Sequence, residues 1–277
     1  MSAASEYAEL LKLIEVSGPF VSLPVFKEVF PQGVGKDSPE LTRELREVYE
    51  EWREARIHAQ AIVSPAQREW LRGVFTTLLG WPADWLAEDN AIPQDLSYFV
   101  AQHHETLRPD AVLMEDGKPR LLIGLLPPSQ QPDRRPPGTT WNASYATRMA
   151  ELLHATRVPI GLVTNGERFT LVYADPGQPT GFADFRAELW FDERLTLRAF
   201  RDFLSADALF NRPPEQTLDA LYRRSLENQQ EVSTTLGRQV RRAVEMFVAA
   251  LDRPTGKAAA RCSMAYPRST FMKPRCL

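Results

Sequence analysis

The residues best suited to chemistry lie near the middle of the chain. Asp110 begins an apolar run that ends at Met114, and a second apolar run covers Leu121 to Leu126. The Asp116-Gly117 pair between them predicts a β-hairpin, so Asp110 should lie beside the end of the second strand. A carboxylate there could be one oxygen ligand of Mg²⁺, provided that the neighbouring strand supplied another.

Arg108-Pro109-Asp110 and the two strands resemble the outline of a PD-(D/E)xK nuclease. The resemblance implies a carboxylate and a lysine at the end of the second strand, where they would hold Mg²⁺ and activate water. The matching positions are Gly124 and Leu126, which can do neither. Asp110 is therefore interpreted as a vestigial catalytic residue with no metal site, or simply as the residue that begins a strand.

Two alternatives for metal chemistry stay open at this point. Glu105 or Glu115 could replace the missing ligand, which would give a Mg²⁺-dependent DNA endonuclease with a relocated carboxylate. His103 and His104 are adjacent, and neighbouring residues on a strand point to opposite faces, so they are not expected to chelate one ion.

A second hairpin is a candidate for DNA contact. Thr164-Asn165-Gly166-Glu167-Arg168 predicts a tight type I′ turn. It is either a plain turn or a polar hairpin whose Asn165 and Arg168 touch a DNA backbone. Arg148 is a further DNA-binding candidate. The net charge of −3 supplies no general attraction for DNA, so a local basic surface is needed. The hypothesis draws that surface from Arg134, Arg135, Arg148, Arg168, Arg241 and Arg242.

These residues need a scaffold, and the pattern predicts a mixed one. Residues 1–94 read as mainly helical, and residues 95–205 as a small mixed sheet with strands at 108–114, 121–126, 158–164 and 168–174. A further strand is expected at 187–191, and the five prolines within 127–140 predict an exposed loop. Residues 206–253 form a helical extension. The fold class is α+β or α/β, with a sheet of restriction-endonuclease-like type.

Three segments, 11–20, 159–169 and 237–245, resemble the amino-terminal part of large type IIG restriction-modification proteins. In that family a nuclease-like region precedes an adenine-specific DNA methyltransferase. The resemblance covers roughly residues 5–253, and it carries over only Asp110 as a metal-ligand position. It implies DNA and other restriction-modification proteins as partners. No glycine-rich turn follows a strand, so no AdoMet site and no other cofactor is expected in this chain.

The last residues differ from the rest. Residues 254–277 show no periodic pattern and contain both cysteines, Cys262 and Cys276, which are expected to be unpaired thiols without a zinc site. Read in a shifted frame, permitted codons spell an amphipathic continuation that resembles the family. The tail is therefore interpreted as out of frame, and the chain as a fragment truncated before its methyltransferase.

The chain begins without the basic and apolar pattern of a signal peptide, and no apolar run is long enough for a membrane span. A cytoplasmic protein without membrane contact is expected. The leading functional hypothesis is a truncated, noncatalytic, DNA-associated module of a restriction-modification methyltransferase. The competing hypotheses are the endonuclease above and a structural or docking domain that does not touch DNA.

Overall fold

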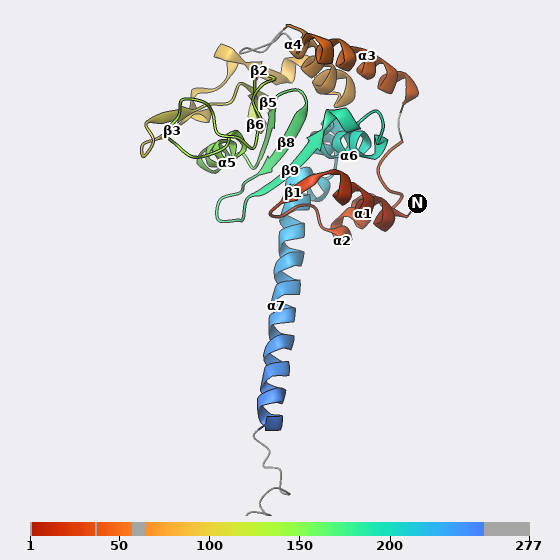
Figure 1. The fold of residues 1–277 in the computed structure, drawn as a ribbon, viewed down its shortest axis with the longest axis vertical. Coiled ribbons are helices and arrows are strands. Elements are labelled where there is room, and N and C mark those ends of the chain that lie inside the picture. The colour runs from red at the N-terminus through yellow and green to blue at the C-terminus, as the bar shows by residue number, and fades with distance from the viewer. Residues whose placement is uncertain (1, 37, 57–64, 252–277) are drawn as a thin grey trace, which may run out of the picture. The chain divides into compact units, whose positions relative to one another are not determined.

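The computed structural model describes residues 2–36, 38–56 and 65–251 (Figure 1). Residues 1–229 form one compact unit, and the chain from Gln230 onward forms a second. Helix α7 (Leu218–Leu251) begins in the first unit and contributes its later residues to the second. The predicted out-of-frame tail, with Cys262 and Cys276, lies outside the described residues.

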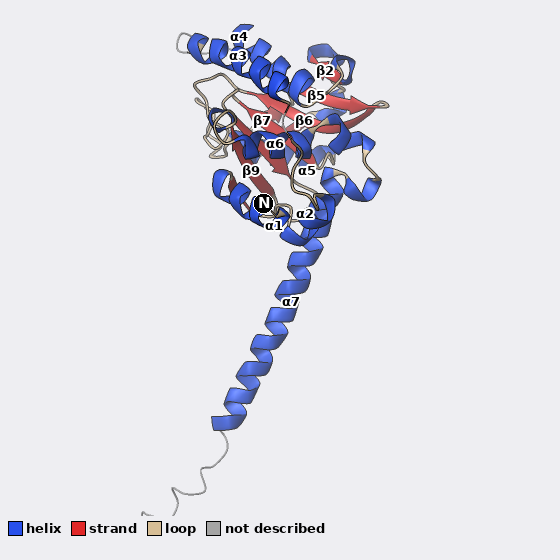
Figure 2. Ribbon diagram, turned by 90° about the vertical axis from the view of Figure 1, so that its right-hand side faces the viewer, coloured by secondary structure: helices blue, strands red, loops and turns tan. Residues whose placement is uncertain are grey.

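A seven-stranded sheet lies at the centre of the first unit, in the order β1-β9-β8-β7-β6-β5-β2 (Figure 2). All neighbours are antiparallel except β6 and β7, which are parallel. Helix α5 connects that pair, because parallel neighbours need a crossover. The strands are β1 (Glu15–Ser17), β2 (Leu86–Glu88), β5 (Ala111–Glu115), β6 (Lys118–Leu125), β7 (Ile160–Thr164), β8 (Arg168–Tyr173) and β9 (Gly181–Arg186).

Helices cover both faces of this sheet because apolar residues occur on both sides of its central strands. Along β6, Leu121 and Ile123 join the core beneath α6 (Arg194–Leu204), whereas Leu122 joins the core beneath α5 (Tyr145–Thr156). Strands buried on both faces read as continuous apolar runs instead of alternating ones. The predicted mixed α+β architecture is confirmed, including the order of two strands, a helix and two strands.

The first hundred residues supply helices α1 (Ala3–Leu13), α2 (Leu23–Val29), α3 (Pro39–Ala55) and α4 (Pro65–Arg72). Helix α3 begins with a capped first turn, since the Ser38 side chain accepts from the Leu41 N–H and Pro39 occupies the first turn. This segment also contributes both edge strands, β1 and β2, to the main sheet. Strands β3 (Tyr98–Val100) and β4 (Glu105–Leu107) form a separate two-stranded sheet.

Two local predictions are wrong. Residues 187–189 form a short 3₁₀ turn, and the strand expected at 187–191 is instead β9, which ends at Arg186. The β7–β8 turn is not type I′, because that type needs positive φ at both central residues and only Gly166, at φ +89°, has it. A Cβ on Gly166 would also lie 2.9 Å from Trp52 Cζ2, so this turn requires glycine.

The proline-containing loop is largely exposed, as predicted, but it is anchored at several points. Ala146 N donates to Pro132 O, and Tyr145 N donates to Arg134 O. Within the described ranges, no helix combines the length and apolarity that crossing a membrane demands.

Candidate functional site

The β5–β6 hairpin places Asp110 beside Gly124, as the sequence predicted. Asp110 N donates to Ile123 O at 2.8 Å, and the Asp110 carboxylate accepts from Leu125 N at 2.7 Å. Ala111 pairs with Ile123 in the register of the two strands. The start of one strand and the end of its neighbour are therefore joined through the carboxylate that stands where the nuclease outline has a metal ligand.

Positions 124 and 126 face the same side of the sheet, toward α5. A Cβ on Gly124 would lie 3.3 Å from Met149 Cε, and Leu126 is buried in the core that α5 covers. A cavity of about 330 Å³ opens here. Asp110 is the one carboxylate among its lining residues, and most of its wall is apolar, from Leu125, Leu126, Met149, Leu152 and Val163.

Partial desolvation in this cavity raises the pKa of Asp110, and the hydrogen bond from Leu125 N opposes that rise. Among the described residues that line the cavity, there is no second carboxylate that could change the pKa of Asp110 further. Across the described ranges, no group of three or more His, Cys, Asp and Glu side chains is placed to share a metal ion.

Neither carboxylate proposed as a relocated ligand is suitably placed. Glu105 is held by Thr139 and Arg148, and the Thr139 hydrogen bond followed by the arginine lowers its pKa. Glu115 pairs with Arg120 at 2.6 Å and lies at the far end of β5. Glu115 lies five positions along the chain from Asp110, which is about 16 Å at the usual rise of a strand.

The adjacent histidines make separate aromatic contacts, and the His104 ring lies 6.5 Å from the Phe99 ring. The His103 ring stacks on Trp141 at 4.6 Å, and the Arg148 guanidinium lies 4.5 Å from the centre of the same indole. Arg148 also donates to Thr139 Oγ1 at 2.9 Å and is largely buried. Its charge is thus used to join α5 to the proline-containing loop and to β4.

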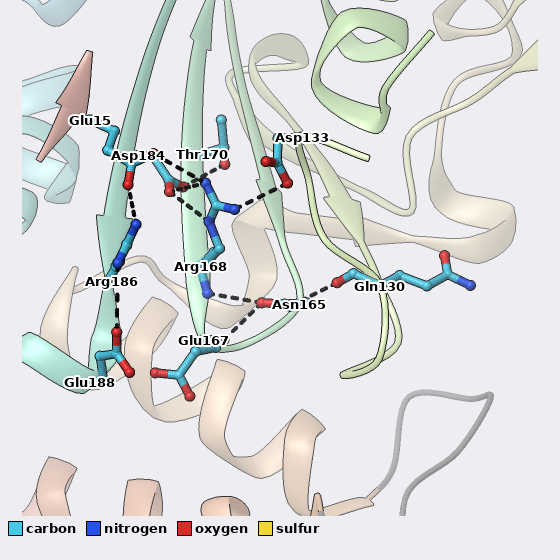
Figure 3. A network of polar contacts seen from close by, with 10 residues as sticks. All are labelled: Glu15, Gln130, Asp133, Asn165, Glu167, Arg168, Thr170, Asp184, Arg186 and Glu188. Atoms are coloured by element: carbon cyan, nitrogen blue, oxygen red, sulfur yellow. Dashed lines mark hydrogen bonds and ion pairs between the residues drawn. The ribbon is translucent and has the colours of Figure 1, made fainter. Parts of the chain in front are cut away.

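Asn165 is buried in the β7–β8 turn, where its side chain makes three hydrogen bonds (Figure 3). Its Oδ1 accepts from Glu167 N at 3.0 Å and Arg168 N at 2.9 Å, and its Nδ2 donates to Gln130 O at 2.8 Å. These bonds set the turn and attach the loop that walls the cavity. They leave the amide facing the protein.

Arg168 reaches from the same turn into a network of carboxylates (Figure 3). Its Nε donates to Asp184 at 2.7 Å, and its other nitrogens lie 3.1 Å from Asp133 and 3.8 Å from Glu15. Desolvation works against the charge, but Asp184, Asp133 and Glu15 together raise the pKa of Arg168. A cavity of about 380 Å³ beside this network carries three carboxylates for its one arginine.

These contacts divide the arginines of the predicted basic surface into paired and exposed residues. Arg148 and Arg168 are engaged in ion pairs inside the fold, whereas Arg134 and Arg135 are exposed on the loop. Arg241 and Arg242 are exposed on α7, within the second unit. Arg148 and Arg168 therefore hold elements of the fold in place through these ion pairs.

Sequence reasoning missed two residues that hold this region together. Gln67 Nε2 donates to Leu126 O at 2.8 Å and to Asn165 O at 2.7 Å, and Trp70 Nε1 donates to Gly166 O at 2.6 Å. Both come from α4, so a helix of the amino-terminal region positions the ends of β6 and β7. No local pattern in the sequence signals such long-range bonds.

Comparison with known proteins gives one match. The family model described as MmeI, N-terminal domain, matches residues 74–250, which is well over half of the chain. No curated protein and no solved structure matches.

Proposed function

The chain belongs to the MmeI N-terminal domain family, the amino-terminal region of type IIG restriction-modification enzymes, and on that premise we propose that it is a noncatalytic, DNA-associated module. As part of a restriction-modification system it would act in the cytoplasm, where it would meet DNA. Its protein partners would be the methyltransferase and other components of that system.

One observation carries the noncatalytic assignment. The hairpin brings Asp110 to its expected place, but the neighbouring position is Gly124, and the wall around it is apolar. Mg²⁺ takes six oxygen ligands and is usually held by one or two carboxylates together with substrate oxygens. The PD-(D/E)xK arrangement needs two carboxylates that share the ion, whereas Asp110 is the one carboxylate among the described residues that line this cavity and already accepts from Leu125 N, so we assign no cofactor to this site.

The residues of the site then have a structural role. Asp110 fixes the end of the hairpin, Arg148 joins α5 to the loop, and Asn165 attaches that loop to the β7–β8 turn. The scaffold of a nuclease is retained as architecture, and DNA contact is made by surfaces outside the cavity.

A plasmid-nicking assay with Mg²⁺ tests the assignment. The purified chain is expected to leave supercoiled plasmid intact, and the Asp110→Asn variant is expected to behave identically. Asp116→Asn, at the opposite end of the same hairpin, is the matched control. Nicking that Asp110→Asn abolishes and Asp116→Asn retains would establish an endonuclease and refute the proposal.

The two competing functions separate on DNA binding. A DNA-associated module binds duplex with an affinity that falls as salt rises. Binding that is undetectable at low salt would instead favour a docking domain that contacts only proteins. No contact in the described residues favours the relocated-carboxylate endonuclease, since Glu105 and Glu115 are both paired with arginines.

A further inference from the structure

A basic cleft lies at the opposite end of the β5–β6 hairpin from Asp110. Its cavity of about 520 Å³ is bounded by the hairpin turn, by the segment after α5, and by residues 209–223 at the start of α7. All of these residues lie in the first unit. Five arginine or lysine residues and two carboxylates line the cleft, in a chain whose net charge is −3.

Both carboxylates of the cleft are already paired. Glu115 accepts from Arg120, and Asp219 accepts from Arg223. Lys118 and Arg157 make no ion pair and no side-chain hydrogen bond with any described residue. Lys118 and Arg157 therefore contribute unpaired positive charge to the cleft.

The fifth basic residue of the cleft, Arg212, interacts with residues that do not line it. Its guanidinium lies 5.2 Å from the centre of the Phe30 ring, and desolvation lowers its pKa while Asp202 and Asp207 oppose that change. Its charge is accounted for by groups outside the cleft.

The amino end of α7 adds backbone donors to the same cleft. Residues 217–220 line the cavity, and the first N–H groups of a helix have no partner within it. Thr217 Oγ1 donates to Pro214 O at 2.9 Å and to Asp219 Oδ1 at 2.7 Å, and no described side chain caps the next amides. Such N–H groups, together with the positive end of the helix dipole, favour an anion.

We infer that this cleft binds a phosphate group through Lys118, Arg157 and the amino end of α7. The cavity beside Arg168 is lined by three carboxylates, which disfavour an anion, and the two arginines that line the cavity beside Asp110 are engaged with Asp89 O and Glu105. The phosphate could belong to duplex DNA or to a free nucleotide, and the chemistry of recognition is shared. Assignment to DNA rests on the proposed function, whereas phosphate binding itself does not.

Arg157 allows this site to be tested without damaging the fold. It ends α5 with φ +59°, a left-handed conformation that glycine adopts without the steric cost of a Cβ. Arg157→Gly should therefore remove a cation without lowering the free energy of unfolding. Lys118→Gln completes the double variant, and Arg53→Gln, exposed on α3, is the matched control.

The full chain is titrated with three probes, a duplex of about 20 base pairs, ATP and inorganic phosphate, and each titration is repeated at several fixed salt concentrations. The double variant should bind duplex about tenfold more weakly, and its log–log salt slope should fall by about 1.8, the value for two lost phosphate contacts. Arg53→Gln should bind like the wild type.

The outcomes separate the two sources of phosphate. Loss of duplex binding in the double variant assigns the cleft to the DNA backbone. Loss of ATP and phosphate binding alone assigns it to a free nucleotide. The inference is overturned if the wild type binds none of the probes, or if the double variant binds all of them as the wild type does. Plasmid nicking by the wild type would refute the proposed function and leave this result untouched.

Discussion

The two ends of the β5–β6 hairpin have opposite chemistry. At one end, Asp110 stands alone against a wall of leucine, methionine and valine side chains. At the other end, about 16 Å of strand away, Lys118 and Arg157 carry unpaired positive charge beside a helix amino terminus. A resemblance to nucleases directs attention to the first end, but the groups able to bind an anion are at the second.

This contrast shows that a backbone arrangement can be present without the side chains that a catalytic site would need. The backbone that would place two carboxylates together is kept by bonds such as Asp110 to Leu125 N. Those bonds stabilise the sheet whether or not a metal is present. A hairpin with no second carboxylate at this end can therefore keep its fold, and function must be argued from the groups present, not from the fold.

Asn165→Ala should lower the stability of the fold more than the other substitutions, because the buried side-chain amide of Asn165 makes three hydrogen bonds at the cavity end of the hairpin. The substitution leaves Gln130 O, Glu167 N and Arg168 N without their partner, so the free energy of unfolding should fall by about 3 kcal/mol. Urea unfolding measures it. Asn165→Asp keeps the acceptor and loses the donor, so an intermediate loss is expected. A neutral Asn165→Ala would return this residue to the surface role that the sequence suggested.

Leu126→Ala and Lys118→Ala compare the two ends directly. Leu126 is 5% exposed and packs in the core beneath α5, so its truncation should cost about 2 kcal/mol. Lys118 is exposed, and its truncation should change stability by less than about 0.5 kcal/mol. Equal costs in urea unfolding would contradict the division into a packed end and a binding end.

Asp110→Asn should have the smallest effect, and it should depend on pH. Desolvation raises the pKa of Asp110 above its ordinary 3.8, so the folded chain holds this proton more tightly than the unfolded chain. Wild-type stability is then lost as pH rises through the folded pKa, and the variant lacks this loss. Asparagine can still accept from Leu125 N. The stability of the variant relative to the wild type should therefore rise as pH increases from below 3.8, and a fall over the same titration would place Asp110 in an unseen stabilising pair.

Sequence patterns predicted the elements better than the contacts between them. The Asp116-Gly117 turn and the apolar runs on either side of it are local signals, and each was found. The type of the β7–β8 turn was not, because Trp52 and Trp70 pack on Gly166 from distant helices. Local preference cannot anticipate a turn that is shaped by tertiary packing.

The candidate site divides in the same way. The adjacency of Asp110 and Gly124 follows from hairpin register alone, so it could be predicted. The pairing of Arg168 with Asp184 and of Arg148 with Glu105 could not, since both join different elements and remove the arginines from the surface. The basic cleft was missed for a related reason, because it gathers residues near 118, 157 and 219 that are far apart in the chain.

Edge strand β1 has a consequence for synthesis of the chain. Glu15 pairs with Asp184 and Ser17 with Phe182, so this strand finds its only sheet neighbour, among the described strands, nearly 170 residues later. At ribosomal rates of about 5–20 residues per second, it waits roughly 10–30 s before it can pair. During that time α1 and β1 leave the ribosome with no sheet to join, and closure of the fold must be a late event of translation.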